Sequence, residues 1–112
     1  MARHRYIATH LAGMLAACAV AGAAHADPDM LRQRQLEHLL RQDCGSCHGL
    51  RLTGGLGPPL TREALAGKPR ELLIATITLG RPGTPMPNWD ALLDTQDIAW
   101  LADRLLQGSP PP

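Results

Sequence analysis

Two cysteines and a histidine stand together in the segment C-G-S-C-H, residues 44–48. This spacing is the attachment signature of c-type haem, in which each thiol can form a thioether with a vinyl group of the porphyrin. The histidine that follows then falls beneath the iron, where an imidazole is a common axial ligand. We therefore predict one covalent haem c bound through Cys44 and Cys47, with His48 as the proximal iron ligand.

Two other interpretations of the motif fit the sequence less well. A redox C-x-x-C pair of the thioredoxin type needs a βαβ context, and no strand-like alternation surrounds Cys44 and Cys47. A structural zinc site needs four ligands, usually two pairs of Cys or His residues. Besides Cys44, Cys47 and His48, residues 27–112 contain only one more histidine, His38, and no other cysteine. Covalent haem is the interpretation that the spacing supports best.

A second candidate ligand, Met86, lies 38 residues after His48 in the segment G-T-P-M-P. Each flanking proline fixes its own φ and biases the preceding residue towards extended geometry, so the methionine sits in a stiff loop. Stiffness lowers the entropy lost when sulfur binds iron, and His/Met ligation raises the reduction potential. We predict Met86 as the distal iron ligand. Met30 and His38 are weaker candidates, and filling a gap in a turn is the ordinary alternative for Met86.

The elements that must hold these ligands are expected to be helical. Residues 29–42 predict a helix that runs into the haem motif. The Gly- and Pro-rich residues 49–60 predict a loop along the proximal edge of the haem. Thr61 is expected to cap a short turn that ends at Gly67.

Two further helices are expected in the second half of the chain. Residues 69–79 predict a helix with Pro69 at its first position, apolar nearly all round and therefore buried, and ended by Gly80. Asp94 is the expected N-cap of the last helix, with an inward stripe of Ile98, Leu101 and Leu105. No repeat and no strand alternation is present, so the predicted fold class is all-α.

Residues 1–26 predict an export signal that is cleaved. Basic residues at positions 3–5 precede an apolar run, and positions 24–26 have the A-x-A pattern of a cleavage site. The run is shorter than the ~20 residues that a spanning helix needs. The alternative is a lipoprotein signal cleaved before Cys18, in the segment L-A-A-C. Residues 27–112 are then a single monohaem domain.

The composition of residues 27–112 leaves little to fill a core. They contain no Phe or Tyr and only two tryptophans, Trp89 and Trp100, and a domain this small often needs an additional staple. The haem is expected to supply it. Cleavage removes two arginines and no acidic residue, which changes the formal charge from +1 to −1. Neither a nucleic-acid-binding surface nor a cationic membrane-binding face is indicated.

Taken in order, these features resemble the class I c-type cytochromes across residues 27–112. The marks are C-x-x-C-H, then G-P-P-L at 57–60, then Met86 before a C-terminal helix. The resemblance implies a small class I cytochrome c fold, with helices wrapped around one covalently bound haem. It also implies that a proline carbonyl accepts a hydrogen bond from the proximal histidine and raises its donor strength. Pro58 fits that position best, with Pro59 as the alternative.

One departure from the family pattern concerns the crossing of the first and last helices. Class I cytochromes usually carry an aromatic residue on the last helix at that crossing, and Arg104 occupies the matching place here. Trp100 lies four residues earlier on the same side of the helix. We expect Trp100 to supply the crossing contact instead.

The segments CGSCHGLRLTGGLGPPLT and GTPMPNW are most similar to the cytochrome c-55X (NirC) family, which is associated with cytochrome cd1 nitrite reductase. The resemblance implies a periplasmic one-electron carrier that donates electrons to this reductase in denitrification. The alternative is an accessory factor in haem d1 biosynthesis or insertion. An enzymatic role is not expected. We expect a monomer with redox proteins as partners and, unless Cys18 is lipidated, no membrane contact.

Overall fold

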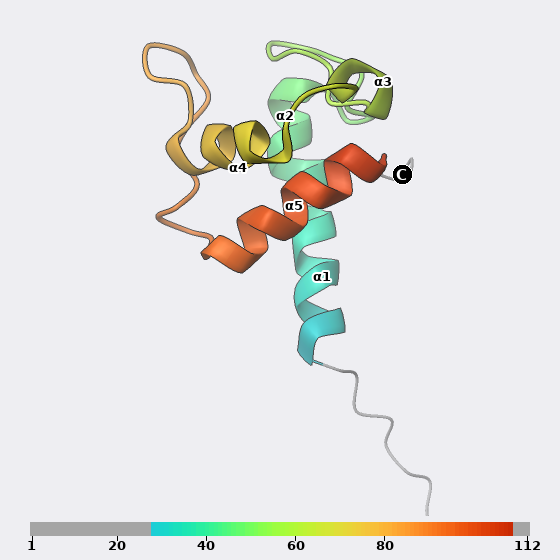
Figure 1. Cartoon of the computed structure of the whole chain (residues 1–112), viewed down its shortest axis with the longest axis vertical. Coiled ribbons are helices and arrows are strands. Elements are labelled where there is room, and N and C mark those ends of the chain that lie inside the picture. Colours follow the sequence, from blue (N-terminus) through green and yellow to red (C-terminus); the bar gives the residue numbers. More distant parts are fainter. Residues whose placement is uncertain (1–27, 109–112) are drawn as a thin grey trace, which may run out of the picture.

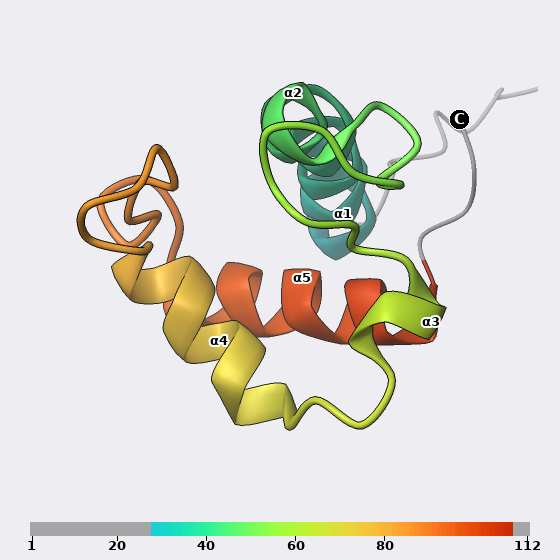
Figure 2. The same cartoon turned by 90° about the horizontal axis from the view of Figure 1, so that it is seen from above.

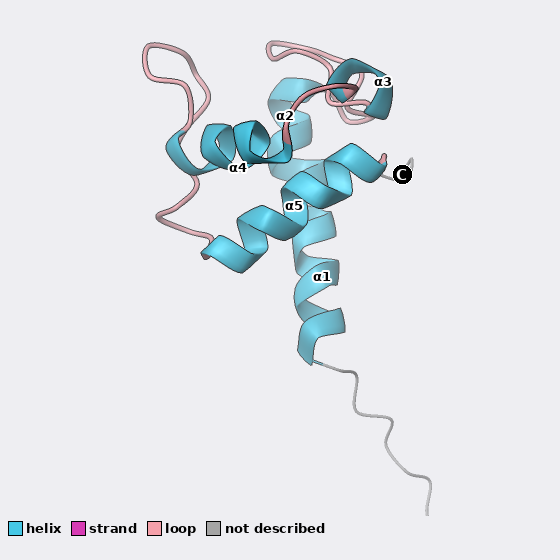
Figure 3. Ribbon diagram, viewed as in Figure 1, coloured by secondary structure: helices cyan, strands magenta, loops and turns pink. Residues whose placement is uncertain are grey.

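The computed structural model describes residues 28–108, and within this range it contains helices and loops but no strand (Figure 3). The elements in chain order are α1 (Pro28–Leu39), the π-helical turn η1 (Leu40–Cys44), α2 (Gly45–His48), α3 (Arg62–Leu65), α4 (Arg70–Leu79) and α5 (Thr95–Gln107). The all-α prediction is confirmed. None of the described helices has the length and apolar character that crossing a membrane requires. The predicted signal 1–26 and the alternative at Cys18 lie outside the described residues.

The haem motif lies at the end of one helical column, because α1, η1 and α2 follow one another without a loop (Figure 1). Where α1 gives way to η1, the backbone N–H of Gly45 donates to the carbonyl of Leu40, five residues back. This wider turn is rare and often occurs at functional sites. The helix predicted over residues 29–42 is confirmed, and the structure adds that it reaches the motif through a π-helical turn.

The predicted loop over residues 49–60 is confirmed, and it folds back against the end of α2. The N–H groups of Gly54 and Gly57 donate to the carbonyls of His48 and Cys47, each at 2.8 Å. These bonds satisfy carbonyls that the end of a helix would otherwise leave free. Thr61 then caps α3 as expected, since its Oγ1 accepts from the N–H of Ala64 at 3.3 Å.

The helix α4 begins one residue later than predicted, because Pro69 has extended geometry and serves as the N-cap. It ends before Gly80, whose φ of 65° stops the helix as predicted. The expectation that α4 is buried all round is wrong, since Leu72 in its first turn is 48% exposed and Ala75 in its middle is also exposed. Leu73 is buried, but Leu79 is 66% exposed. The helix packs on α5 through one face (Figure 2), which leaves Leu79 in solvent.

The last helix forms as the sequence predicts and contributes much of the core. Asp94 is its N-cap and accepts a hydrogen bond from the N–H of Asp97 at 2.8 Å. Its inward stripe is buried. The hydrophobic core is aliphatic throughout and consists of Leu36, Leu40, Leu52, Leu65, Leu73, Leu93, Ile98, Leu101, Ala102 and Leu105.

Ion pairs join α1 to α5 at both ends of their crossing. Arg32 binds Asp97 through two hydrogen bonds, with Nε donating to Oδ1 at 3.0 Å. Arg104 donates to the Glu37 carboxylate, so the arginine at the family's aromatic position holds the two helices together by charge. Trp100, the predicted substitute, is half-buried and packs against the aliphatic core.

Candidate haem site

A cavity of about 540 Å³ lies among η1, the loop 49–60, α4 and the segment 81–89. Its volume is within the range of ~300–1,000 Å³ that is usual for ligand sites. Most of its wall is aliphatic, supplied by Leu39, Leu40, Leu56, Leu60, Leu65, Leu72, Leu73, Ile77, Leu101 and Leu105. The cavity therefore suits a large apolar group held by a small number of polar side chains.

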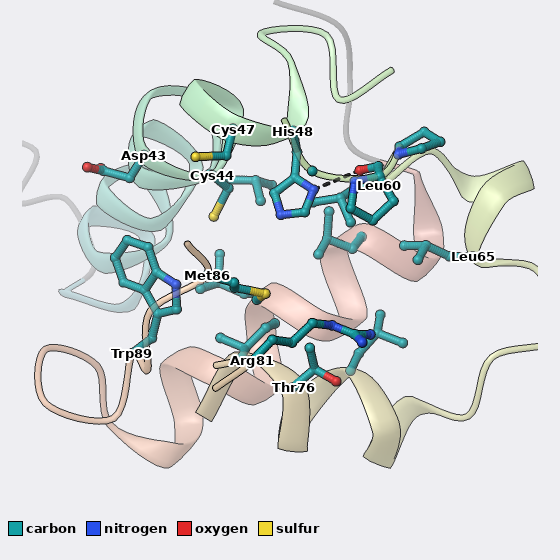
Figure 4. Close-up of a pocket in the computed structure, with 18 of the residues that line it drawn as sticks. Asp43, Cys44, Cys47, His48, Leu60, Leu65, Thr76, Arg81, Met86 and Trp89 are labelled. Carbon is teal, nitrogen blue, oxygen red and sulfur yellow. Dashed lines mark hydrogen bonds between the residues drawn. The ribbon is translucent and has the colours of Figure 1, made fainter. Parts of the chain in front are cut away.

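Cys44 and Cys47 line one edge of this cavity, and Figure 4 shows both side chains there. Residues three apart on a helix share a face, and both cysteines are free thiols. Burial, followed by the nearby Asp43 carboxylate, raises the pKa of the Cys44 thiol to about 11. Both sulfurs are positioned for covalent attachment of haem through a C-x-x-C-H motif. With its raised pKa, the Cys44 thiol stays protonated at neutral pH.

The His48 ring enters the cavity from the end of α2 and is buried. Its Nδ1 lies 2.7 Å from the carbonyl oxygen of Pro58. A carbonyl only accepts, so Nδ1 carries the proton and Nε2 keeps a free lone pair. Of the two prolines left open by the sequence, Pro58 is the one that accepts this bond.

Gly57 makes room for the His48 ring, a role that sequence reasoning missed. A Cβ at this position would lie 2.7 Å from both Nδ1 and Cε1 of the imidazole, well inside van der Waals contact. The glycine stands in the G-P-P-L segment that marks the family resemblance. That segment gave the signal, but only the folded chain shows what the glycine contacts.

Met86 reaches the cavity from the other side, and Figure 4 places His48 and Met86 on facing walls. Its loop is closed by its own hydrogen bonds. The N–H of Arg81 donates to the carbonyl of Met86 at 3.1 Å. The Thr84 hydroxyl donates to the carbonyl of Arg81 at 2.7 Å and accepts from the N–H of Met86 at 3.3 Å. These bonds add to the stiffness that the two prolines impose.

Gly80, at the start of this methionine loop, lets the backbone pack closely against Pro87 at the end of the loop. Its φ is 65°, and a Cβ there would lie 2.5 Å from the carbonyl carbon of Pro87. Two residues further on, the N–H of Trp89 donates to the carbonyl of Ile77 on α4 at 3.1 Å. The loop is therefore fastened at both ends, and Trp89 lines the cavity close to Met86 (Figure 4).

The two weaker candidate ligands lie away from the cavity. Met30 is 51% exposed on the first turn of α1, and His38 is exposed on the same helix. Neither lines the cavity. The structure instead adds polar wall residues that the sequence did not single out, namely Lys68, Thr76 and Arg81.

The residues present fit a haem bound through this edge. Two thiols stand at one end, an imidazole nitrogen with a free lone pair and a thioether face each other, and the remaining wall is aliphatic. The surroundings of His48 support the same conclusion, because Gly57 leaves space for the imidazole ring that a larger residue would fill.

Comparison with known proteins identifies relatives of this chain. Residues 31–103 match the family described as cytochrome c oxidase, cbb3-type, subunit III. A cytochrome c55X of Stutzerimonas stutzeri is 72% identical over 90 residues, which cover 80% of each chain. A solved structure of a c-type cytochrome NirC is similar with a TM-score of 0.72 and 67% identity, over 76% of this chain and all of that one.

A more distant match involves a longer protein. A dihydro-heme d1 dehydrogenase of Pseudomonas aeruginosa is 36% identical to this chain over 74 residues. The match covers 66% of this chain but only 15% of the dehydrogenase.

Proposed function

The chain belongs to the cytochrome c55X family of c-type cytochromes, and on that premise we propose that it carries single electrons to cytochrome cd1 nitrite reductase in denitrification. Family resemblance supports the choice of partner. The site supports the kind of reaction. The observation that carries the proposal is the placement of His48 and Met86 on facing walls of one cavity (Figure 4).

In the loaded protein, Cys44 and Cys47 would hold the haem, and His48 Nε2 and the Met86 sulfur would bind its iron. The haem supplies an iron centre that gains and loses one electron at a potential set by its ligands and surroundings. If both side chains bind the iron, a substrate would have to displace one of them to reach it. This arrangement favours electron transfer over an enzymatic reaction.

The surrounding residues set the conditions for that transfer. The bond from His48 Nδ1 to the Pro58 carbonyl strengthens the imidazole as a donor and keeps its ring oriented. Aliphatic wall residues keep water from the ligands, and the methionine loop, closed by its own hydrogen bonds, holds Met86 in place. A site that holds His48 and Met86 this firmly would limit the change in their positions between the two oxidation states.

We place the protein in the periplasm, as the predicted signal over residues 1–26 implies. The domain that follows has a formal charge close to zero, so long-range attraction to a charged partner is weak. Contact near Cys44 and Cys47, where an edge of the haem would lie, would then depend mainly on shape and short-range interactions.

Mixing the reduced holoprotein with oxidised cytochrome cd1 nitrite reductase in a stopped-flow instrument tests the proposal. We expect rapid reoxidation of the haem, with a rate constant that falls less than tenfold between low and moderate salt. Met86→Ala should slow the reaction strongly. Met30→Ala is the matched control, because it removes the exposed methionine on α1, and its rate should not change. Absence of reoxidation by the reductase would exclude it as the acceptor.

A second candidate, an accessory role in haem d1 biosynthesis or insertion, is favoured by the match to part of a dihydro-heme d1 dehydrogenase. Oxidation of a dihydro compound releases two electrons, and a one-electron carrier can remove them one at a time. Two measurements test this role: titration of the protein with haem d1, and mixing of its ferric form with the dehydrogenase during turnover. No spectral change in the first and no haem reduction in the second would exclude the role.

A further inference from the structure

The polar side chains of the cavity are not spread evenly along its wall. Asp43 lies at the end that carries the cysteines (Figure 4). Arg81 extends its guanidinium away from the cysteines, and Thr76 on α4 lies on the same wall (Figure 4). Lys68, from the turn between α3 and α4, adds a second cation to the lining. The cavity therefore carries an acid at the thiol edge and hydrogen-bond donors elsewhere.

These donors have no partner among residues 28–108. The ion pairs in that range join other arginines to carboxylates, at Arg32, Arg41, Arg70 and Arg104. Neither Lys68 nor Arg81 takes part in one. The guanidinium of Arg81 is a planar fork that suits two-point binding of a carboxylate, and the Thr76 hydroxyl can donate to the same group.

The chemistry of haem c indicates what these donors bind. The two vinyl-derived positions lie on neighbouring pyrrole rings, and the two propionates lie on the remaining pair of rings. A porphyrin fastened to Cys44 and Cys47 by its vinyl edge must therefore direct its carboxylates away from them. We propose that Arg81, together with Thr76, binds one haem propionate. This proposal rests on haem attachment at the cysteines, but not on the redox partner.

Arg81 also holds the loop that carries Met86, so binding a carboxylate would have a second effect. Its backbone N–H donates to the Met86 carbonyl at 3.1 Å, and its carbonyl accepts from the Thr84 hydroxyl at 2.7 Å. A guanidinium anchored on a propionate would fix the residue whose backbone N–H and carbonyl take part in these two bonds. Arg81 is thus a positioning residue that links one end of the haem to the distal ligand loop.

The test compares three holoprotein variants. Arg81→Gln removes the charge, Arg81→Lys keeps it, and Arg34→Gln makes the same charge change on an exposed α1 residue that does not line the cavity. Loss of a cation near the iron disfavours the ferrous state. For Arg81→Gln we expect the ferrous-to-ferric ratio at fixed solution potential to fall at least threefold. Cyanide should also bind the ferric form at least threefold faster. Arg81→Lys should keep the wild-type ratio within twofold, and Arg34→Gln should leave both quantities unchanged.

An infrared readout separates this role from a purely structural one. Redox-induced difference spectra report the carboxylate stretching bands of haem propionates, and Arg81→Gln should shift one of them. The same shift is expected for Thr76→Val, which keeps the side-chain size and removes the donor. This variant carries the test alone if Arg81→Gln yields no holoprotein. Unchanged propionate bands in the variant measured, or equal potential changes in Arg81→Gln and Arg34→Gln, would overturn the proposal. Neither result would bear on electron transfer to the reductase.

Discussion

Replacing Gly57 with alanine is expected to disturb the proximal side of the haem site directly. The new Cβ would lie 2.7 Å from Nδ1 and Cε1 of His48 and 3.2 Å from its Cγ. Ordinary van der Waals contact begins near 3.4 Å, so either the ring or the loop must move by several tenths of an ångström. The ring has little freedom, since its Nδ1 lies only 2.7 Å from the Pro58 carbonyl oxygen.

The expected cost combines two effects. Overpacking of a tight site usually costs about 1–3 kcal/mol, and loss or lengthening of the bond from His48 to Pro58 adds about 0.5–1.5 kcal/mol. The free energy of unfolding should therefore fall by roughly 2–4 kcal/mol. A weaker Nδ1 hydrogen bond also makes the imidazole a poorer donor to ferric iron, so the reduction potential should rise.

Guanidinium unfolding followed by circular dichroism, together with a redox titration, measures both effects. Gly67→Ala is the matched control, because Gly67 has a φ of 77° and a Cβ there would meet nothing within 4 Å. It should cost only the backbone strain of about 1–2 kcal/mol and leave the potential unchanged. If Gly57→Ala loses no more stability than Gly67→Ala and keeps the wild-type potential, the steric reasoning about His48 is wrong.

Three further changes probe other parts of the structure. Gly80→Ala would place a Cβ 2.5 Å from the Pro87 carbonyl carbon, so it should displace the methionine loop and raise the rate of cyanide binding to the ferric protein, measured by stopped-flow absorbance. Asp94→Ala removes the N-cap bond of α5 and should lower the free energy of unfolding by about 1 kcal/mol, whereas Asp94→Ser should restore most of it. The hydrogen bond from Arg32 lowers the pKa of Asp97 below its usual 3.8. The hydrogen bond between Arg32 and ionised Asp97 therefore stabilises the fold fully above about pH 3.8, and this stabilisation is lost as the pH falls through the lowered pKa of Asp97. Asp97→Asn should show a smaller loss of stability than the wild type below about pH 3.8 in acid unfolding monitored by circular dichroism.

Local chemistry made the elements and the site largely predictable from the sequence. Asp94 and Thr61 are caps whose side chains can bond only to backbone N–H groups a few residues ahead, and the structure has both bonds. The spacing of C-x-x-C-H places its two cysteines and its histidine close together on a helix, because residues three and four apart share a face. The G-P-P-L segment indicated a proline carbonyl, but only the folded loop distinguishes Pro58 from Pro59.

The rest depends on contacts between segments far apart in the sequence. Nothing local indicates that Arg104 would meet Glu37 across the helix crossing, since the pair joins residues 67 positions apart. The exposed face of α4, with Leu72 and Leu79, was missed because an apolar pattern does not show which face a neighbour covers. The π-helical turn from Leu40 to Cys44 also has no clear residue signature.

The central claim is a haem tethered to Cys44 and Cys47 and held between His48 and Met86. Its most direct test is the ferric near-infrared spectrum of the mature holoprotein, recorded for the wild type, Met86→Ala and Met30→Ala after intact mass shows one haem per chain. We expect the thioether-to-iron charge-transfer band in the wild type and in Met30→Ala, and its loss in Met86→Ala. A mass equal to that of the bare polypeptide would contradict the attachment, and a band that survives Met86→Ala would contradict the distal ligand.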